Sequence, residues 1–240
     1  MRRIQYCLVV LFLLAFANHA QAKDKSNRLI FTYDGHPRTV YYYVPDDPGE
    51  EPIVLLLHGS GRDGTEMLNA WKSLAASEHF ILAAPDSLNS AVWDSQYDPP
   101  AFLHAVVDQV SAIHKIDSRR IYLFGHSGGA VYALALALID SEYYAATAVH
   151  AGAFPAQNEH LFTYAKRDMP IAIWVGDHDT FFPVDRVAAT KALFDSHGFH
   201  VQLNVIPNHS HDYAEASEKV DRQAWKFFEE TELPLPQTAQ

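Results

Sequence analysis

The chain has 240 residues, of which 48% are hydrophobic and 20% charged, with 11 glycines and 13 prolines. This composition excludes a disordered or low-complexity polymer, and the length suits one globular domain. Lys and Arg number 18 against 29 Asp and Glu, a formal net charge of -11. Because nucleic-acid affinity depends on clustered Lys and Arg, and no basic stripe is present, we predict no nucleic-acid partner.

The first 22 residues have the organisation of a signal peptide. Arg2 and Arg3 supply a positive start, residues 8–16 form an apolar run, and Ala20-Gln21-Ala22 has the small-x-small pattern of a cleavage site. The run is too short to span a bilayer. We therefore predict a secreted or periplasmic protein whose mature chain, residues 23–240, is a single domain without a membrane span. A retained N-terminal anchor is the alternative.

The only cysteine, Cys7, lies inside this predicted leader. The mature chain would then contain no thiol. We therefore expect no disulfide, no thiol nucleophile and no zinc-thiolate site.

The predicted domain opens with two β-rich segments, residues 29–33 and 39–44, on either side of the turn dipeptide Asp34-Gly35, which predicts an antiparallel pair. Beyond a proline-bearing link, short apolar runs alternate with longer amphipathic ones, which indicates β-α units around a mostly parallel sheet. Each of these runs is apolar enough to be covered on both faces. The predicted strands are 53–57, 80–84, 120–124, 145–149, 171–175 and 201–206.

Five helices are predicted between these strands, on both faces of the sheet. In the second helix, apolar residues recur at helical spacing at Phe102, Val106, Val110 and Ile113. The third is apolar at nearly every position, so we expect it to be buried on most sides. The predicted helices are 65–77, 101–114, 128–139, 184–197 and 214–230.

A serine stands at the turn between predicted strand 120–124 and the helix that follows it. The segment Gly125-His126-Ser127-Gly128-Gly129 matches the G-x-S-x-G pattern in the strand-turn-helix context that gives the pattern meaning. Glycines two positions from the serine allow a turn so sharp that a side chain there would collide with neighbouring backbone. This turn would lift the Ser127 hydroxyl to the carboxyl edge of the sheet. We predict Ser127 as a nucleophile; a chance glycine-rich turn is the alternative.

A serine nucleophile needs a base, and the base needs an acid to hold it. Predicted strand 171–175 runs into two carboxylates, Asp177 and Asp179. We prefer Asp179, which lies further from the strand and is placed like the acid of G-x-x-D-x-x-x-P loops in hydrolases. Asp177 is expected to order the loop through the backbone, as turn aspartates do.

The candidate bases follow predicted strand 201–206. Of His209 and His211, we prefer His211, because the aromatic Tyr213 two positions on could pack against the base. His209 would then stabilise its loop or face the substrate.

An oxyanion hole is predicted from the loop after the first parallel strand, His58-Gly59-Ser60-Gly61. One backbone N–H would come from Ser60 and the other from Gly128, the residue after the nucleophile. His58 is expected to tie the loop down through a side-chain hydrogen bond.

In this order, the motifs resemble those of the α/β-hydrolase superfamily, and more narrowly those of secreted poly(3-hydroxybutyrate) depolymerase, feruloyl esterase and dienelactone-hydrolase-like esterases. The resemblance implies an α/β-hydrolase fold without a cap domain and acyl transfer to Ser127, with His211 as the base that Asp179 orients. Water would then release the acyl group. The motifs are LLLHGSG at 55–61, APD at 84–86 with Trp93 after it, GHSGGA at 125–130, GDHDTFFP at 176–183 and NHSHDY at 208–213.

Residues 150–170 are too few for a cap, so we expect an open site that accepts a small-molecule or polymeric ester. Trp93, Phe181, Phe182 and Tyr213 could line this site as substrate-binding residues, or could simply pack the loops. No cofactor or metal is predicted, and the sequence does not indicate an oligomeric state.

Three other readings compete with the esterase. A serine peptidase on the same scaffold would share every motif, and a catalytically silent binding domain could use the same fold. A metal-dependent hydrolase is the third, although it would leave the context of Ser127 unexplained. Its ligands would come from Asp177, His178, Asp179, His209, His211 and Asp212.

Overall fold

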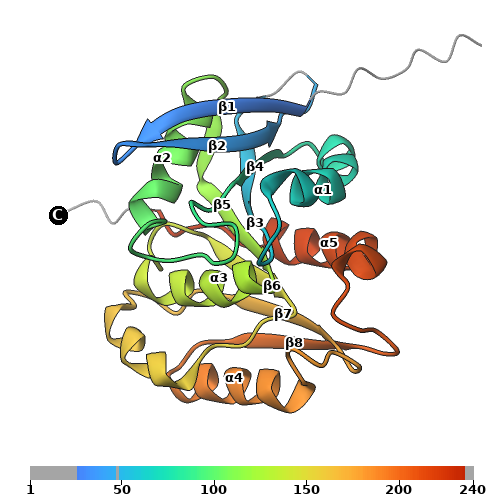
Figure 1. Cartoon of the computed structure of the whole chain (residues 1–240). Coiled ribbons are helices and arrows are strands. Elements are labelled where there is room, and N and C mark those ends of the chain that lie inside the picture. The colour runs from blue at the N-terminus through green and yellow to red at the C-terminus, as the bar shows by residue number, and fades with distance from the viewer. Residues whose placement is uncertain (1–25, 47–48, 236–240) are drawn as a thin grey trace, which may run out of the picture.

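The computed structural model describes residues 26–46 and 49–235 (Figure 1). The predicted signal peptide, residues 1–22, lies outside the described residues, as does Cys7. Two strands, β1 (Ser26–Tyr33) and β2 (His36–Tyr43), form an antiparallel hairpin. Both turn residues, Asp34 and Gly35, have positive φ, 49° and 76°, as tight two-residue hairpins require. The predicted N-terminal antiparallel pair is confirmed.

The strands of the described chain form one eight-stranded sheet, in the order β1-β2-β4-β3-β5-β6-β7-β8. Strand β2 pairs with β4 antiparallel, and every later pair is parallel. The predicted mostly parallel α/β sheet is therefore confirmed. The remaining strands are β3 (Glu51–Leu57), β4 (Ile81–Pro85), β5 (Ile116–His126), β6 (Ala146–His150), β7 (Ile171–Gly176) and β8 (Val201–Ile206).

Helices cover both faces of this sheet (Figure 1). Helices α2, α3 and α4 pack on one face, and α1 and α5 pack together on the other. Strand β3 is buried from both sides, with Leu55 in one apolar layer and Leu56 in the other. The helices are α1 (Gly64–Glu78), α2 (Pro100–Ser111), α3 (Gly128–Ile139), η1 (a 3-10 helix, Ala156–Tyr164), α4 (Val184–Ser196) and α5 (Tyr213–Glu229).

The expected burial of α3 is confirmed, but two other burial predictions are wrong. Strand β8 is the last strand of the sheet, and because α5 lies over β6 and β7 instead, its Val205 is 45% exposed. Ile113 lies beyond the end of α2 at Ser111 and is 52% exposed, so it does not extend the buried face of that helix.

The carboxyl ends of the parallel strands meet at one edge of the sheet, where the loops carry the predicted site residues. Between β6 and β7, the chain forms η1, which the sequence did not predict because its short turns have no helical periodicity. Leu161 and Phe162 of η1 pack against the core beside α3.

Among residues 26–46 and 49–235, no helix combines the length and apolar character needed to cross a membrane.

Candidate active site

Ser127 occupies a strained turn between β5 and α3. Its φ of 54° and ψ of -116° lie outside the regions that residues with a side chain favour. Close packing holds the turn in place: a Cβ on Gly125 would overlap the carbonyl of Gly129, and one on Gly129 would overlap the carbonyl of Leu57. The predicted need for glycine at these two positions is confirmed. The turn exposes the Ser127 hydroxyl on the wall of a pocket.

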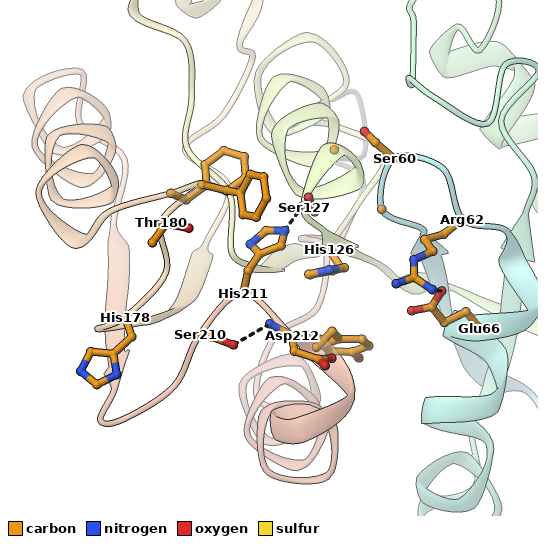
Figure 2. A pocket seen from close by; sticks show the side chains of 15 residues that line it. Ser60, Arg62, Glu66, His126, Ser127, His178, Thr180, Ser210, His211 and Asp212 are labelled. Carbon is orange, nitrogen blue, oxygen red and sulfur yellow. Dashed lines mark hydrogen bonds and ion pairs between the residues drawn. The ribbon is translucent and has the colours of Figure 1, made fainter.

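His211 lies between Ser127 and Asp179, and Figure 2 shows its contact with the serine. The distance from His211 Nε2 to Ser127 Oγ is 2.9 Å, and that from His211 Nδ1 to Asp179 Oδ2 is 2.8 Å. Asp179 is buried, and its other oxygen accepts hydrogen bonds from the N–H groups of Phe181 and Phe182. With the proton of Nδ1 donated to Asp179, Nε2 can accept the hydroxyl proton of Ser127.

Asp177 and His209, the alternatives to Asp179 and His211, have other partners. The side chain of Asp177 is 38% exposed and accepts a hydrogen bond from the backbone N–H of His209 at 3.3 Å. His209 is buried, and its Nε2 lies 3.2 Å from Nε2 of His150. The structure therefore brings Ser127, His211 and Asp179 together and leaves Asp177 and His209 outside that array.

The loop after β3 lies against the first residue of α3. A Cβ on Gly128 would meet Ser60 Oγ at 2.5 Å and Ser60 N at 3.4 Å, so the two backbones are neighbours. As the first residue of a helix, Gly128 has an N–H without an intrahelical acceptor. The N–H of Gly61, in contrast, donates to the carbonyl of Ser90 at 2.7 Å. Ser60 and Gly128, the predicted pair of donors, both lie on the same pocket wall as Ser127.

His58 anchors this loop. Its Nε2 accepts a hydrogen bond from the N–H of Ser87 at 3.1 Å, and its Nδ1 lies 2.9 Å from the carbonyl of Gly59. The predicted structural role of His58 is confirmed. Trp93 is a second anchor, because its Nε1–H donates to the carbonyl of His58 at 2.9 Å. Trp93 is buried outside the pocket at Ser127 and lines a neighbouring cavity that also reaches Gly128.

The pocket at Ser127 has a volume of about 730 Å³. Phe181 and Phe182, both predicted to line the site, do so, with ring centroids 4.8 and 5.8 Å from that of His211. Another part of the wall is polar and carries Arg62 and Glu66, whose side chains approach to 3.5 Å (Figure 2). The pocket therefore offers an ester both aromatic and polar surface.

Tyr213 lines the pocket, and its ring packs against that of His126 rather than against His211 as expected. The two ring centroids are 5.1 Å apart at an angle of 17°. Tyr213 begins α5, and its side chain points into the layer between α5 and α1. There, its hydroxyl accepts from Trp71 Nε1 at 2.7 Å and donates to Asp221 at 2.5 Å. This buried hydroxyl has its partners within the protein and does not face the pocket.

Three buried histidines form a group that was not predicted from the sequence: His126 lines the pocket, and His150 and His209 lie behind it. His126 Nδ1 is 3.0 Å from His150 Nδ1, and His150 Nε2 is 3.2 Å from His209 Nε2. Their positions in the chain give no signal, because only the pairing of β5 with β6 places His126 beside His150. Burial, together with neighbouring histidines, lowers the pKa of His126 to about 4 and that of His150 to about 2.

These two histidines are expected to make the fold sensitive to acid. An unfolded histidine titrates near pH 6.5, so below that pH the unfolded chain binds protons that the folded chain excludes. Above about pH 6.5, the free energy of unfolding does not depend on the protonation of these two residues. Below it, this free energy decreases as the pH falls. The decrease is about 1.4 kcal/mol per pH unit for each residue, or about 2 kcal/mol for each residue by pH 5. Urea unfolding at pH 7 and pH 5 measures the loss.

The variant His150→Gln should lose less stability than the wild type between these two pH values, whatever its stability at pH 7. The exposed His160 offers a matched control, and His160→Gln should keep the wild-type pH dependence. If wild type and His150→Gln lost the same stability between pH 7 and pH 5, His150 would not be a source of the acid sensitivity.

The candidate metal ligands do not gather at one point. His209 contacts His150, while His211 contacts Asp179 and Ser127. Within the part of the chain that the structure describes, no group of three or more His, Cys, Asp or Glu residues is arranged to hold a metal ion.

Comparison with known proteins adds family and fold relationships. Residues 73–231 match the dienelactone hydrolase family. The chain is 30% identical over 160 residues to the putative esterase NocK of Nocardia uniformis subsp. tsuyamanensis, covering 62% of this chain and 46% of that protein. It is 26% identical over 146 residues to the bifunctional acetylxylan esterase/xylanase XynS20E of Neocallimastix patriciarum, covering 58% and 21%. The chain thus spans less than half the length of either relative.

Among solved structures, a thermostable esterase is similar, with a TM-score of 0.71 and 17% identity, covering 87% of this chain and 64% of that one. At this identity, the similarity concerns the fold, which is that of an α/β-hydrolase. The predicted fold class is confirmed.

Proposed function

This chain belongs to the dienelactone hydrolase family, and we propose that it is a secreted serine esterase that hydrolyses carboxylic esters through Ser127, His211 and Asp179. One observation carries the proposal: an activated serine, a base and a buried acid form a continuous hydrogen-bonded array at the wall of an open pocket. Both curated relatives are described as esterases, which supports ester hydrolysis as the reaction.

In the first half of the reaction, Ser127 Oγ attacks the carbonyl carbon of the ester while His211 Nε2 takes the hydroxyl proton. Asp179 holds the imidazole in the correct tautomer and stabilises the imidazolium. The N–H groups of Ser60 and Gly128 stabilise the negative charge on the former carbonyl oxygen. The bond to the alcohol oxygen then breaks, and the alcohol leaves with the proton from His211.

The second half repeats these steps with water. His211 Nε2 takes a proton from a water molecule, whose oxygen attacks the carbonyl carbon of the acyl-enzyme. The bond to Ser127 Oγ breaks, and the proton on His211 returns to the serine. The products are a carboxylic acid and the free enzyme, so no cofactor is needed.

The sequence supports the remaining parts of the proposal. Residues 1–22 have the pattern of a signal peptide, and residues 23–240 would form the single mature domain. The open pocket can receive a small ester or the chain end of a polymeric one.

A panel of paired substrates tests the esterase against a peptidase and against a silent binding domain. We expect the full mature chain to hydrolyse esters faster than 4-nitroanilides with the same acyl groups. The esters are 4-nitrophenyl acetate, a feruloyl ester, an acetylated sugar and a hydroxybutyrate ester. We also expect labelling by a fluorophosphonate, because this reagent requires an activated serine. Comparable rates on anilides would favour a peptidase. No turnover together with no labelling would overturn the proposed function.

A further inference from the structure

The buried histidines behind the pocket form a continuous chain that the reaction described above does not use. The chain runs from His126 through His150 to His209 by two contacts between ring nitrogens, at 3.0 and 3.2 Å. His126 is 8% exposed, His150 0% and His209 5%. Buried polar groups are costly to desolvate, so such a chain calls for a physical explanation.

The two ends of this chain have different surroundings. At one end, His209 Nδ1 lies 4.0 Å from the carboxylate of Glu215, whose side chain is 65% exposed. At the other end, the His126 ring is part of the pocket wall beside Ser127, and its Nε2 has no hydrogen-bond partner among residues 26–46 and 49–235. The chain therefore joins a surface carboxylate to an available nitrogen at the pocket.

Neutral imidazoles in such a chain must all point their protons in the same direction. Each ring has one N–H donor and one bare nitrogen acceptor, and each contact between rings needs one proton. If His209 Nδ1 carries the proton, His209 Nε2 accepts from His150 Nε2–H, and His150 Nδ1 accepts from His126 Nδ1–H. His126 Nε2 is then a bare acceptor.

Glu215 selects this direction. The reverse arrangement would place the lone pair of His209 Nδ1 toward the carboxylate, which also only accepts. The selected arrangement instead points the N–H of His209 Nδ1 toward the carboxylate 4.0 Å away, which the negative charge favours. Burial keeps His126 and His150 neutral by lowering the pKa of each.

We propose that His126 determines specificity by accepting, through Nε2, a hydrogen bond from a hydroxyl group on the alcohol part of the ester, with His150, His209 and Glu215 fixing its tautomer. This inference rests on the proposed esterase function. It deepens that function by naming a substrate class, the esters of alcohols that carry a second hydroxyl group.

The position of His126 indicates which part of the ester it meets. Its ring centroid is 5.1 Å from that of His211, the residue that returns a proton to the leaving alcohol. Figure 2 shows His126 between His211 and Arg62, on the polar part of the pocket wall. A hydroxyl group close to the scissile bond can therefore reach His126 while the alcohol oxygen faces His211.

A matched pair of substrates tests the proposal: 2-hydroxyethyl acetate and 2-methoxyethyl acetate, in which a methyl group replaces the hydroxyl hydrogen and so removes the donor. We expect the wild type to have a kcat/KM about 3- to 10-fold higher for the hydroxyl compound, the range of one neutral hydrogen bond. His126→Phe keeps an aromatic ring against Tyr213 but removes the acceptor. It should bring this ratio close to that of the uncatalysed reaction.

Glu215→Lys tests the tautomer chain from the protein surface. An ammonium donor at this position favours a bare His209 Nδ1 and turns all the protons of the chain around, so that His126 Nε2 becomes a donor. The preference for the hydroxyl compound should then fall, because the oxygens of both compounds can accept from that donor. Glu218→Lys makes the same charge change on α5 at a side chain that is 86% exposed, and it should keep the wild-type preference.

The outcomes separate the two proposals. If the wild type hydrolyses none of the three esters, that is, the two matched acetates and 4-nitrophenyl acetate, the esterase function itself is overturned. An active wild type with no preference, or His126→Phe with the full preference, overturns the role of His126. If His126→Phe does not fold, as thermal unfolding would show, Glu215→Lys decides: a full wild-type preference in that variant overturns the proposal.

Discussion

Replacing Ser127 with alanine is expected to lower kcat for ester hydrolysis by about 10⁵-fold or more. The hydroxyl that this change removes lies 2.9 Å from His211 Nε2, and no acyl-enzyme can form without it. The fold should be unaffected, because alanine keeps the Cβ and places no new atom in the turn. Stopped-flow and initial-rate kinetics with 4-nitrophenyl acetate measure both the acylation burst and the steady rate.

Ser217 on α5, which is not among the residues that line the pocket at Ser127, provides a matched control. Its exposed hydroxyl donates only to the carbonyl of Ala214, so Ser217→Ala should retain the wild-type rate. The donors Ser60 and Gly128 remain in Ser127→Ala, so a small residual rate above that of water is compatible with the proposal. A rate within tenfold of the wild type would show that Ser127 is not the nucleophile.

The second large effect is expected for Asp179→Asn, at about 10⁴-fold in kcat. The environment of the carboxylate gives the reason. One of its oxygens accepts from the N–H groups of Phe181 and Phe182, so an asparagine would keep its oxygen there. Its amide would then point its N–H toward His211 Nδ1, and this favours the tautomer that carries the proton on Nε2. That tautomer cannot take the proton of Ser127.

Asp177 makes this experiment selective, since it is an aspartate of the same loop two residues away. It is partly exposed and contacts the backbone of His209 rather than the ring of His211. The effect of Asp177→Asn on kcat should therefore be several orders of magnitude smaller than that of Asp179→Asn. Equal effects of the two changes would mean that the loop, rather than the acid, supports the activity.

The parts of this molecule that sequence patterns predicted are those that local physics determines. Strands appear at the predicted places because buried parallel strands need nearly continuous apolar runs. The turn at Ser127 needs glycines within two residues of it, so its signal is also local. The preference for Asp179 over Asp177 used only position in the loop, and Asp179 is the one that lies against His211.

The features that were not predicted depend on which elements become neighbours. Tyr213 was expected beside His211, but α5 packs on α1 and draws its hydroxyl to Trp71 and away from the pocket. His126 and His150 are 24 residues apart in sequence and meet only because β5 pairs with β6. Trp93 has the same explanation, since its indole finds the carbonyl of His58 across two loops.

Strand β6 contributes no group to the proposed reaction, yet it lies between the strand that carries the nucleophile and the strand that leads to the acid. Its hydrogen bonds to β5 and β7 set the gap that His211 bridges, because both neighbours are held in register with it. The spacing for proton transfer is therefore a property of the sheet, while most residues that line the pocket lie on the loops at its carboxyl edge. Mutations in these loops can change which esters are accepted without altering that spacing. The scaffold can thus diverge in substrate preference while keeping one chemistry.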